Sequence, residues 1–317
     1  MPPKFQPTAY PGTVHQFTPR LTAFEPQASP PRTTTPNTLL WIGGLGDSLL
    51  TVSYPLTLAS LLPPTWSLAQ VLLSSAGSGW GTTTLAADAS ELAHCVAYFR
   101  DLRPDSKIVL MGHSTGCQDC MEYVVGPGSA DRPPVDGIVL QAPVSDREAL
   151  AEALPGDLLG RSIELARDWC RAGKGDDVLP RAATRHVLGS HVSAKRWLSL
   201  ASPDKDGDDD YFSSDLPMWR IRASFGKIPR RTPLLVLFGG EDEFVPGWVD
   251  RKGLVGRWMD VVREGGGVVD DADGGVVPGA HHNLMEDGEE VVGDLCRRVV
   301  RYLENLGDGE FGMEEQV

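Results

Sequence analysis

Short apolar runs alternate with segments of helical periodicity along most of this chain. The runs are rich in Leu, Ile and Val and lead into loops that contain glycine, which is typical of buried strands in a parallel sheet. We expect strands over residues 38–42, 67–73, 108–111, 137–141 and 233–238, and helices over residues 56–62, 85–100, 117–125 and 289–306. This alternation predicts an α/β fold, in which helices cover both faces of a mostly parallel central sheet.

Two regions depart from the alternation. Residues 1–37 are rich in proline and threonine and contain two short β-like pieces, whereas residues 145–225 are helix-like and carry many charges. Open α/β sheets place ligands at the carboxyl ends of their strands. We therefore expect residues 145–225 to be an insertion, a cap or lid over that edge, and residues 1–144 and 226–317 to form the core.

The turn that follows the apolar run 108–111 has the sequence Gly112-His113-Ser114-Thr115-Gly116, a G-x-S-x-G pattern between a predicted strand and a predicted helix. In such an elbow the serine backbone is strained, and glycines on either side avoid clashes, so that the hydroxyl is exposed. The N–H of Thr115 would lie at a helix N-terminus, where it can stabilise an oxyanion. The alternative is a glycine-rich turn without chemistry.

A serine nucleophile needs a base, and the base needs a carboxylate that holds its tautomer. In α/β-hydrolases the chain order is serine, acid, histidine. His281 and His282 lie in a loop near the end of the chain, and Asp242 follows a predicted buried strand between Glu241 and Glu243. The required order is therefore present, with either histidine as the base.

Several motifs resemble those of a fungal family of α/β-hydrolases that includes intracellular siderophore esterases, enzymes that cleave the ester bonds of fusarinine-type siderophores. The motifs are Gly43-Gly44-Leu45-Gly46-Asp47, Ser78-Gly79-Trp80-Gly81, the elbow extended to Asp119, residues 209–215, and the loops around Asp242 and His282. The resemblance extends from about Gly12 to the last predicted helix.

This resemblance implies an α/β-hydrolase fold and a serine esterase with Ser114, Asp242 and His282 as its triad. It favours His282 over His281, because in the G-A-x-H pattern the base is the later residue. It also makes the backbone N–H of Leu45 the second oxyanion donor beside that of Thr115. No metal or organic cofactor is required for this chemistry.

Composition narrows the possible partners. The formal net charge of −14 disfavours binding to nucleic acid or to an anionic membrane. We find no secretory signal and no apolar run long enough to span a membrane. The five cysteines are sparse and odd in number, so we expect a cytoplasmic protein without a disulfide framework. Cys117 and Cys120 have redox-motif spacing but are expected only to pack.

Aromatic side chains are candidates for the substrate pocket, although each is otherwise explained as core. The candidates are Trp80, Tyr211, Phe212 and Trp219. The run 204–210 holds five aspartates, and we expect it to be an exposed loop, not a calcium site. If it lay over the active site, its field would favour a cationic, amine-bearing substrate.

Two alternatives remain open. Besides the siderophore esterase, these are a carboxylesterase, thioesterase or peptidase of another acyl substrate, and a binding protein on a hydrolase scaffold without catalysis.

Overall fold

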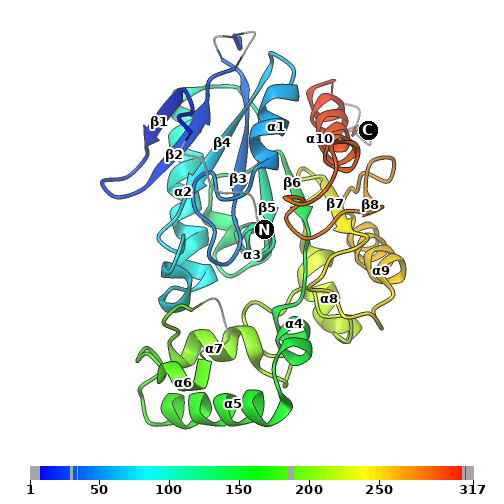
Figure 1. The fold of residues 1–317 in the computed structure, drawn as a ribbon. Helices are drawn as coiled ribbons and strands as arrows, with labels where there is room; N and C mark the ends of the chain where they lie inside the picture. Colours follow the sequence, from blue (N-terminus) through cyan, green and yellow to red (C-terminus); the bar gives the residue numbers. More distant parts are fainter. Residues whose placement is uncertain (1–7, 29–30, 34, 185–188, 309–310, 312–317) are drawn as a thin grey trace.

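The computed structural model describes residues 8–28, 31–33, 35–184, 189–308 and 311. The described residues form one eight-stranded sheet with the strand order β1-β2-β4-β3-β5-β6-β7-β8 (Figure 1). The strands are β1 (Gly12–Gln16), β2 (Thr22–Pro26), β3 (Asn37–Ile42), β4 (Trp66–Leu72), β5 (Ile108–His113), β6 (Gly137–Gln141), β7 (Leu234–Gly239) and β8 (Gly275–Val277).

From β4 to β8 every neighbouring pair is parallel, whereas β1 and β2 join the edge as antiparallel strands. The prediction of a mostly parallel sheet is therefore confirmed. The helices are α1 (Tyr54–Leu61), α2 (Leu85–Leu102), α3 (Thr115–Val125), α4 (Asp146–Ala153), α5 (Gly156–Arg171), α6 (Arg181–Thr184), α7 (Ala194–Ala201), α8 (Met218–Ser224), α9 (Arg251–Glu264) and α10 (Glu289–Asp308), with 3₁₀ turns η1 (Gly79–Thr82), η2 (Ser129–Asp131) and η3 (Phe225–Lys227).

Alternate residues of the strands point to opposite faces of the sheet, as the period of two requires. Leu39 and Trp41 of β3 pack with α1 and α10 on one face. Leu40 and Ile42 pack on the other face, in a core that includes α2, α3 and α9. Both faces of the sheet are thus covered, which explains why the central strands consist of nearly continuous apolar residues.

Helices α4 to α8 lie between β6 and β7 in the sequence, and Figure 1 shows α4, α5, α6 and α7 gathered at one end of the molecule. Trp197 of α7 and Ile163 of α5 belong to a small hydrophobic cluster of their own, together with Trp80 of η1. This cluster joins residues of the 145–225 segment to the loop that precedes α2.

Candidate active site

The turn between β5 and α3 has the strained geometry that the elbow motif predicts. Ser114 adopts φ 53° and ψ −123°, a conformation that costs a non-glycine residue free energy. A Cβ atom at Gly112 would overlap the backbone of Gly116, and one at Gly116 would overlap the carbonyl of Ile42. The Ser114 N–H donates to the carbonyl of Gln141 at 3.1 Å, which ties the turn to β6. These contacts explain why both flanking positions are glycine.

His282 and Asp242 form a buried pair. Nδ1 of His282 lies 2.8 Å from Oδ2 of Asp242, and Asp242 is 1% exposed. Because a carboxylate only accepts hydrogen bonds, Nδ1 carries the proton and Nε2 keeps a free lone pair. The other carboxylate oxygen accepts from the backbone N–H of Phe244 at 3.0 Å. The imidazole is therefore held in the tautomer that a general base requires.

The backbone of His282 is fixed on both sides. Its N–H donates to Oε2 of Glu243 at 3.0 Å, and its carbonyl accepts from Nε2 of Gln141 at 3.1 Å. Sequence reasoning missed Gln141, although a glutamine at the end of an apolar strand is itself an unusual polar residue. Glu243 was considered only as a rival to Asp242, and its contact is with the backbone of His282.

The neighbouring histidine points elsewhere. Nδ1 of His281 lies 2.5 Å from Oδ1 of Asp287, and its side chain is 51% exposed, against 8% for His282. The hydrogen bond that the ring donates to the Asp287 carboxylate raises the pKa of His281. The structure therefore brings His282, and not His281, against Asp242.

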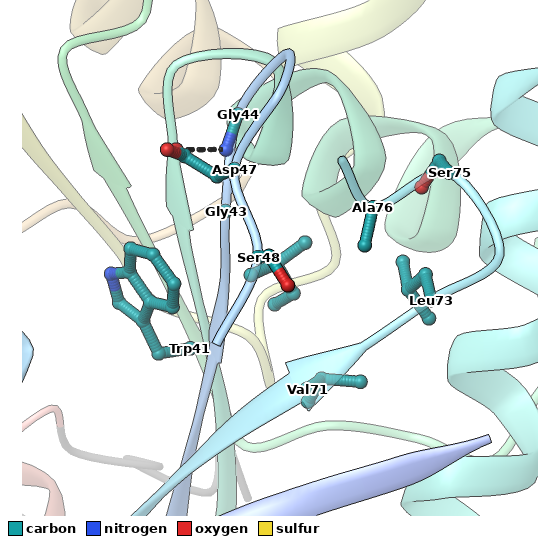
Figure 2. A pocket seen from close by; sticks show the side chains of 10 residues that line it. Trp41, Gly43, Gly44, Asp47, Ser48, Val71, Leu73, Ser75 and Ala76 are labelled. Atoms are coloured by element: carbon teal, nitrogen blue, oxygen red, sulfur yellow. Dashed lines mark hydrogen bonds between the residues drawn. The ribbon is translucent and has the colours of Figure 1, made fainter. Parts of the chain in front are cut away.

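The loop after β3 approaches the elbow closely. Figure 2 shows Gly43 and Gly44 leading out of the strand, with Oδ2 of Asp47 accepting from the Gly44 N–H at 2.8 Å. Leu45 follows and lines the same cavity as Ser114. Among the described residues, neither the Leu45 N–H nor the Thr115 N–H has a hydrogen-bond acceptor. Both donors are thus available to a ligand.

His113 occupies the variable position of the elbow and packs beneath the turn. Its Nδ1 lies 2.6 Å from Oε1 of Gln141, and its ring is stacked on Trp41. Burial, together with the nearby His282, lowers the pKa of His113 to about 4. His113 is therefore uncharged at neutral pH, although its ring centre lies only 5.0 Å from that of His282.

A cavity of about 330 Å³ opens onto Ser114 and His282. One wall comes from the start of the 145–225 segment and is largely apolar, with Asp146 as a charged exception. Phe244 completes the wall and meets the His282 ring edge-on, with ring centres 4.6 Å apart. The apolar lining is Leu45, Val144, Ala149, Leu150, Ala153, Leu154 and Phe244.

The four aromatic residues that we expected in the pocket do not line this cavity. Trp80 is buried in the cluster around Trp197, and Phe212 packs against Phe225 and Trp258. The Tyr211 hydroxyl donates to Oε2 of Glu122 at 2.9 Å beside a different cavity, and Trp219 is 67% exposed on α8. The aliphatic residues of α4 and Phe244 take the place expected of these aromatics.

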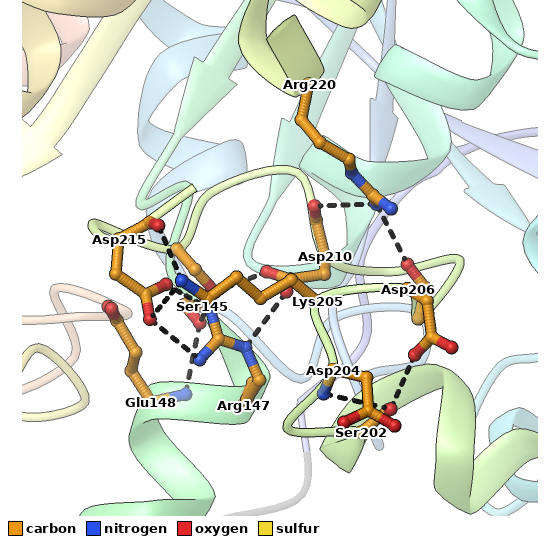
Figure 3. Close-up of polar contacts among 12 residues, drawn as sticks. Ser145, Arg147, Glu148, Ser202, Asp204, Lys205, Asp206, Asp210, Asp215 and Arg220 are labelled. Carbon is orange, nitrogen blue, oxygen red and sulfur yellow. Dashed lines mark hydrogen bonds and ion pairs between the residues drawn. The ribbon is translucent and has the colours of Figure 1, made fainter. Parts of the chain in front are cut away.

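The aspartate run is only in part the exposed loop that we expected: Asp204, Asp206 and Asp208 are exposed, whereas Asp209 and Asp210 are buried. Asp210 is paired with Arg147, and Asp206 accepts from the Ser202 hydroxyl at 2.5 Å, as Figure 3 shows. Asp209 is buried and paired with Arg196. These aspartates are not among the residues that line the cavity at Ser114. Asp204, Asp209 and Asp210 are each paired with an arginine of a neighbouring helix, which reduces the field that this run could exert on a substrate.

The cysteine pair with redox-motif spacing lies in the hydrophobic core. Cys117 and Cys120 are buried, and burial raises the pKa of both thiols well above the usual range, which does not suit redox chemistry. Within the described ranges, no group of three or more His, Cys, Asp and Glu side chains is placed to hold a metal ion. Nor does any helix in this part of the chain have the length and apolar character needed to cross a membrane.

Comparison with known proteins shows the family to which this chain is similar. The family described as "Protein of unknown function (DUF1749)" matches residues 5–304. The fusarinine C esterase sidJ of Aspergillus fumigatus is 38% identical over 351 residues, which cover 96% of this chain and 98% of that protein. The solved structure of the siderophore hydrolase EstB from Aspergillus fumigatus is 36% identical, covers 96% of this chain and 99% of its own, and superposes with a TM-score of 0.82.

The fold is shared more widely than the sequence. A thermostable carboxyl esterase from Bacillus coagulans is 14% identical, with a TM-score of 0.59, over 95% of this chain and 99% of its own. That likeness shows the fold alone, which is the α/β-hydrolase fold expected from the motifs.

Proposed function

The chain belongs to the DUF1749 family of α/β-hydrolases, which includes fungal siderophore esterases, and we propose that it is a serine esterase that acts through an acyl-serine intermediate. The observation that carries this proposal is the buried pair of His282 and Asp242, 2.8 Å apart, at the same cavity as a serine in elbow geometry. A tautomer-fixed imidazole at the same cavity as a strained, half-buried serine is the arrangement that nucleophilic acyl transfer needs.

The reaction proceeds in two halves. The Oγ atom of Ser114 attacks the ester carbonyl while Nε2 of His282 takes its proton, and the N–H groups of Leu45 and Thr115 stabilise the oxyanion. The C–O bond then breaks, and the leaving alcohol receives the proton from His282. Water next attacks the acyl-serine, with His282 again as base, and releases the acid and free Ser114. Asp242 stabilises the imidazolium in both halves.

We assign the substrate to the fusarinine-type siderophores, whose ester bonds would be cut to release iron inside the cell. The names of the two relatives support this choice, as does their coverage of nearly the whole chain. Five free cysteines are consistent with a reducing cytoplasm. Residues 145–225 would act as the cap, because Asp146, Leu150 and Leu154 line the cavity. Another acyl substrate is the second candidate, since the apolar wall alone does not select siderophores.

The test combines covalent labelling with turnover. A fluorophosphonate probe should modify the wild-type protein at Ser114, located by peptide mass spectrometry, and Ser114→Ala should abolish both labelling and hydrolysis of simple esters. Loss of a triad member costs on the order of 10⁴–10⁶ in kcat. Ser60→Ala, in an exposed position on α1, is the matched control. Labelling elsewhere, or a tenth of the activity retained in Ser114→Ala, would require another nucleophile.

The substrate is tested separately. Ferric fusarinine-type esters should be cleaved with a higher kcat/KM than short aryl esters by the wild-type protein. If only the simple esters were cleaved, the serine esterase would stand and the siderophore assignment would fall.

A further inference from the structure

Asp146 is an acidic side chain at the Ser114 cavity that the proposed reaction does not use. It begins α4, directly after Ser145, whose hydroxyl caps the helix by accepting from the Glu148 N–H at 3.1 Å. Its Oδ2 accepts from Nε2 of Gln118 at 2.9 Å. Within the described part of the chain, Oδ1 has no hydrogen-bond partner, so the carboxyl group keeps an unused acceptor at the cavity.

Asp47 is a second acidic residue of the cavity, but both of its carboxylate oxygens accept hydrogen bonds. Its Oδ2 accepts from the Gly44 N–H, and its Oδ1 accepts from the Thr51 hydroxyl at 3.1 Å. Asp47 is therefore committed to holding the loop after β3. Asp146 has no comparable structural duty on its free oxygen.

The side chains around Asp146 are largely apolar, so they stabilise a charged carboxylate less well than water does. Aliphatic side chains of α4 and the phenyl ring of Phe244 line the same cavity. Removing a carboxylate from water into such surroundings costs free energy unless it is paired. An acidic residue kept in an apolar wall beside a reactive serine is a candidate for a functional contact.

The charged groups near Asp146 shift its pKa in both directions. Burial is the main cause that raises its pKa, to about 7, and the nearby Asp209 raises it further. Arg196 and His282 lower the pKa, and Asp210 raises it. At neutral pH the group therefore lies near its midpoint, where a cationic ligand would shift it to the carboxylate form.

We propose that Asp146 is a specificity-determining residue, whose free oxygen binds a protonated amine of the substrate beside the ester that Ser114 attacks. This inference rests on the proposed esterase function and adds a substrate class, esters that carry a cationic nitrogen. A preference for an amine-bearing substrate would then come from one side chain in the cavity and not from the aspartate run. The apolar wall would hold the remainder of the acyl or alcohol chain.

The test uses pairs of esters that differ only in charge. Ethyl 4-aminobutanoate is compared with ethyl pentanoate for an amine on the acyl side, and 2-(dimethylamino)ethyl acetate with 3-methylbutyl acetate for one on the alcohol side. The readout is the ratio of kcat/KM between the charged and the neutral ester of a pair. In at least one pair, wild type should favour the charged ester, and Asp146→Asn should lower the ratio by about ten- to hundredfold, as loss of a hydrogen bond to a charged group predicts.

Control variants separate this role from structure and from general electrostatics. Asp146→Glu should keep the preference for the charged ester, because the carboxylate is retained. Asp208→Asn removes an exposed carboxylate that lines a different cavity, and it should leave the ratio unchanged. A ratio near one in wild type for both pairs, or an equal loss for both esters in Asp146→Asn, would overturn the proposal. If wild type cleaved no ester and no probe labelled Ser114, the esterase function itself would have failed instead.

Discussion

Gly44 and Ser114 are in close contact across the two loops that form the site. A methyl group at Gly44 would lie 2.6 Å from Cβ of Ser114 and 3.1 Å from its Oγ. The loop after β3 therefore passes directly over the nucleophile, which is where a second oxyanion donor has to be. This approach gives a physical reason for the glycine at position 44 that is independent of any motif.

Gly44→Ala should impair catalysis. The added methyl group would push the loop away from Ser114 and displace the Leu45 N–H from the developing oxyanion. Misplacing one such donor costs on the order of 10²–10³ in kcat. Gly256→Ala, at a position in α9 with open space around it, is the control and should retain full activity. Steady-state kinetics on a simple ester would decide, and unimpaired turnover in Gly44→Ala would remove this loop from the mechanism.

The two adjacent histidines should respond very differently to substitution. His282→Ala removes the base and should be nearly as damaging as Ser114→Ala. His281→Ala removes an exposed ring that is bound to Asp287, and it should have little effect on kcat. Initial rates of ester hydrolysis measured side by side would test this order. The reverse order would transfer the role of base to His281.

Asp242→Asn should lower kcat by about 10⁴, because an amide in place of the carboxylate no longer fixes the Nδ1–H tautomer of His282. Glu241→Gln, one residue earlier on an exposed position, is the matched control. Binding of a competitive product should persist in both variants. Comparable losses of kcat in Asp242→Asn and Glu241→Gln would show that this turn acts through its overall negative charge, and that Asp242 is not a specific partner of the imidazole.

The triad residues could be predicted because local sequence motifs mark them. The residues of the cavity wall could not be predicted in this way. Ser114 is marked by two glycines and a strand-to-helix switch within a few residues. The identity of the wall depends on how α4 is docked over the sheet, which is a long-range contact that no nearby residue signals. Phe244 was overlooked for the same reason, although it follows Asp242 by two positions. Of the aromatic candidates, Phe212 and Trp80 fill cores, as large side chains most often do, whereas Trp219 is exposed and Tyr211 lines a different cavity.

Two elements escaped sequence analysis for physical reasons. Helix α9 contains Gly253 and Gly256, which lower helix propensity, and the structure instead secures it by burying Trp258. Strand β8 is only three residues long and lies close to several glycines. β8 is a strand because it pairs with β7, and such pairing depends on tertiary contacts more than on the local sequence.

Removing one partner of the buried pair of Arg196 and Asp209 should be strongly destabilising. Both side chains are at most 3% exposed, and the Ser199 hydroxyl also donates to Asp209 at 2.6 Å. Asp209→Asn would leave a buried guanidinium without its counter-charge, which costs about 3–5 kcal/mol. Asp208→Asn, one residue earlier and exposed, should change the free energy of unfolding by less than about 0.5 kcal/mol. Urea unfolding of both variants would measure the difference, and equal midpoints would show that this pair is not stabilising.

Selectivity for an amine-bearing ester should increase with pH in a way that reports on Asp146. Its pKa is raised to about 7, so the neutral acid predominates below that pH and the carboxylate above it. The amine of ethyl 4-aminobutanoate, with a pKa near the usual value of about 10.4 for an alkyl ammonium, stays charged throughout. The ratio of kcat/KM for this ester over ethyl pentanoate should therefore rise between about pH 6 and 8. Taking the ratio cancels any pH dependence of the shared chemical step, which affects both esters equally, and in Asp146→Asn the ratio should be flat. Among the charged neighbours of Asp146, Arg196 is paired with Asp209, and Asp210 is paired with Arg147. A ratio that rises equally in the Asn variant would assign the pH dependence to another group and withdraw Asp146 from substrate recognition.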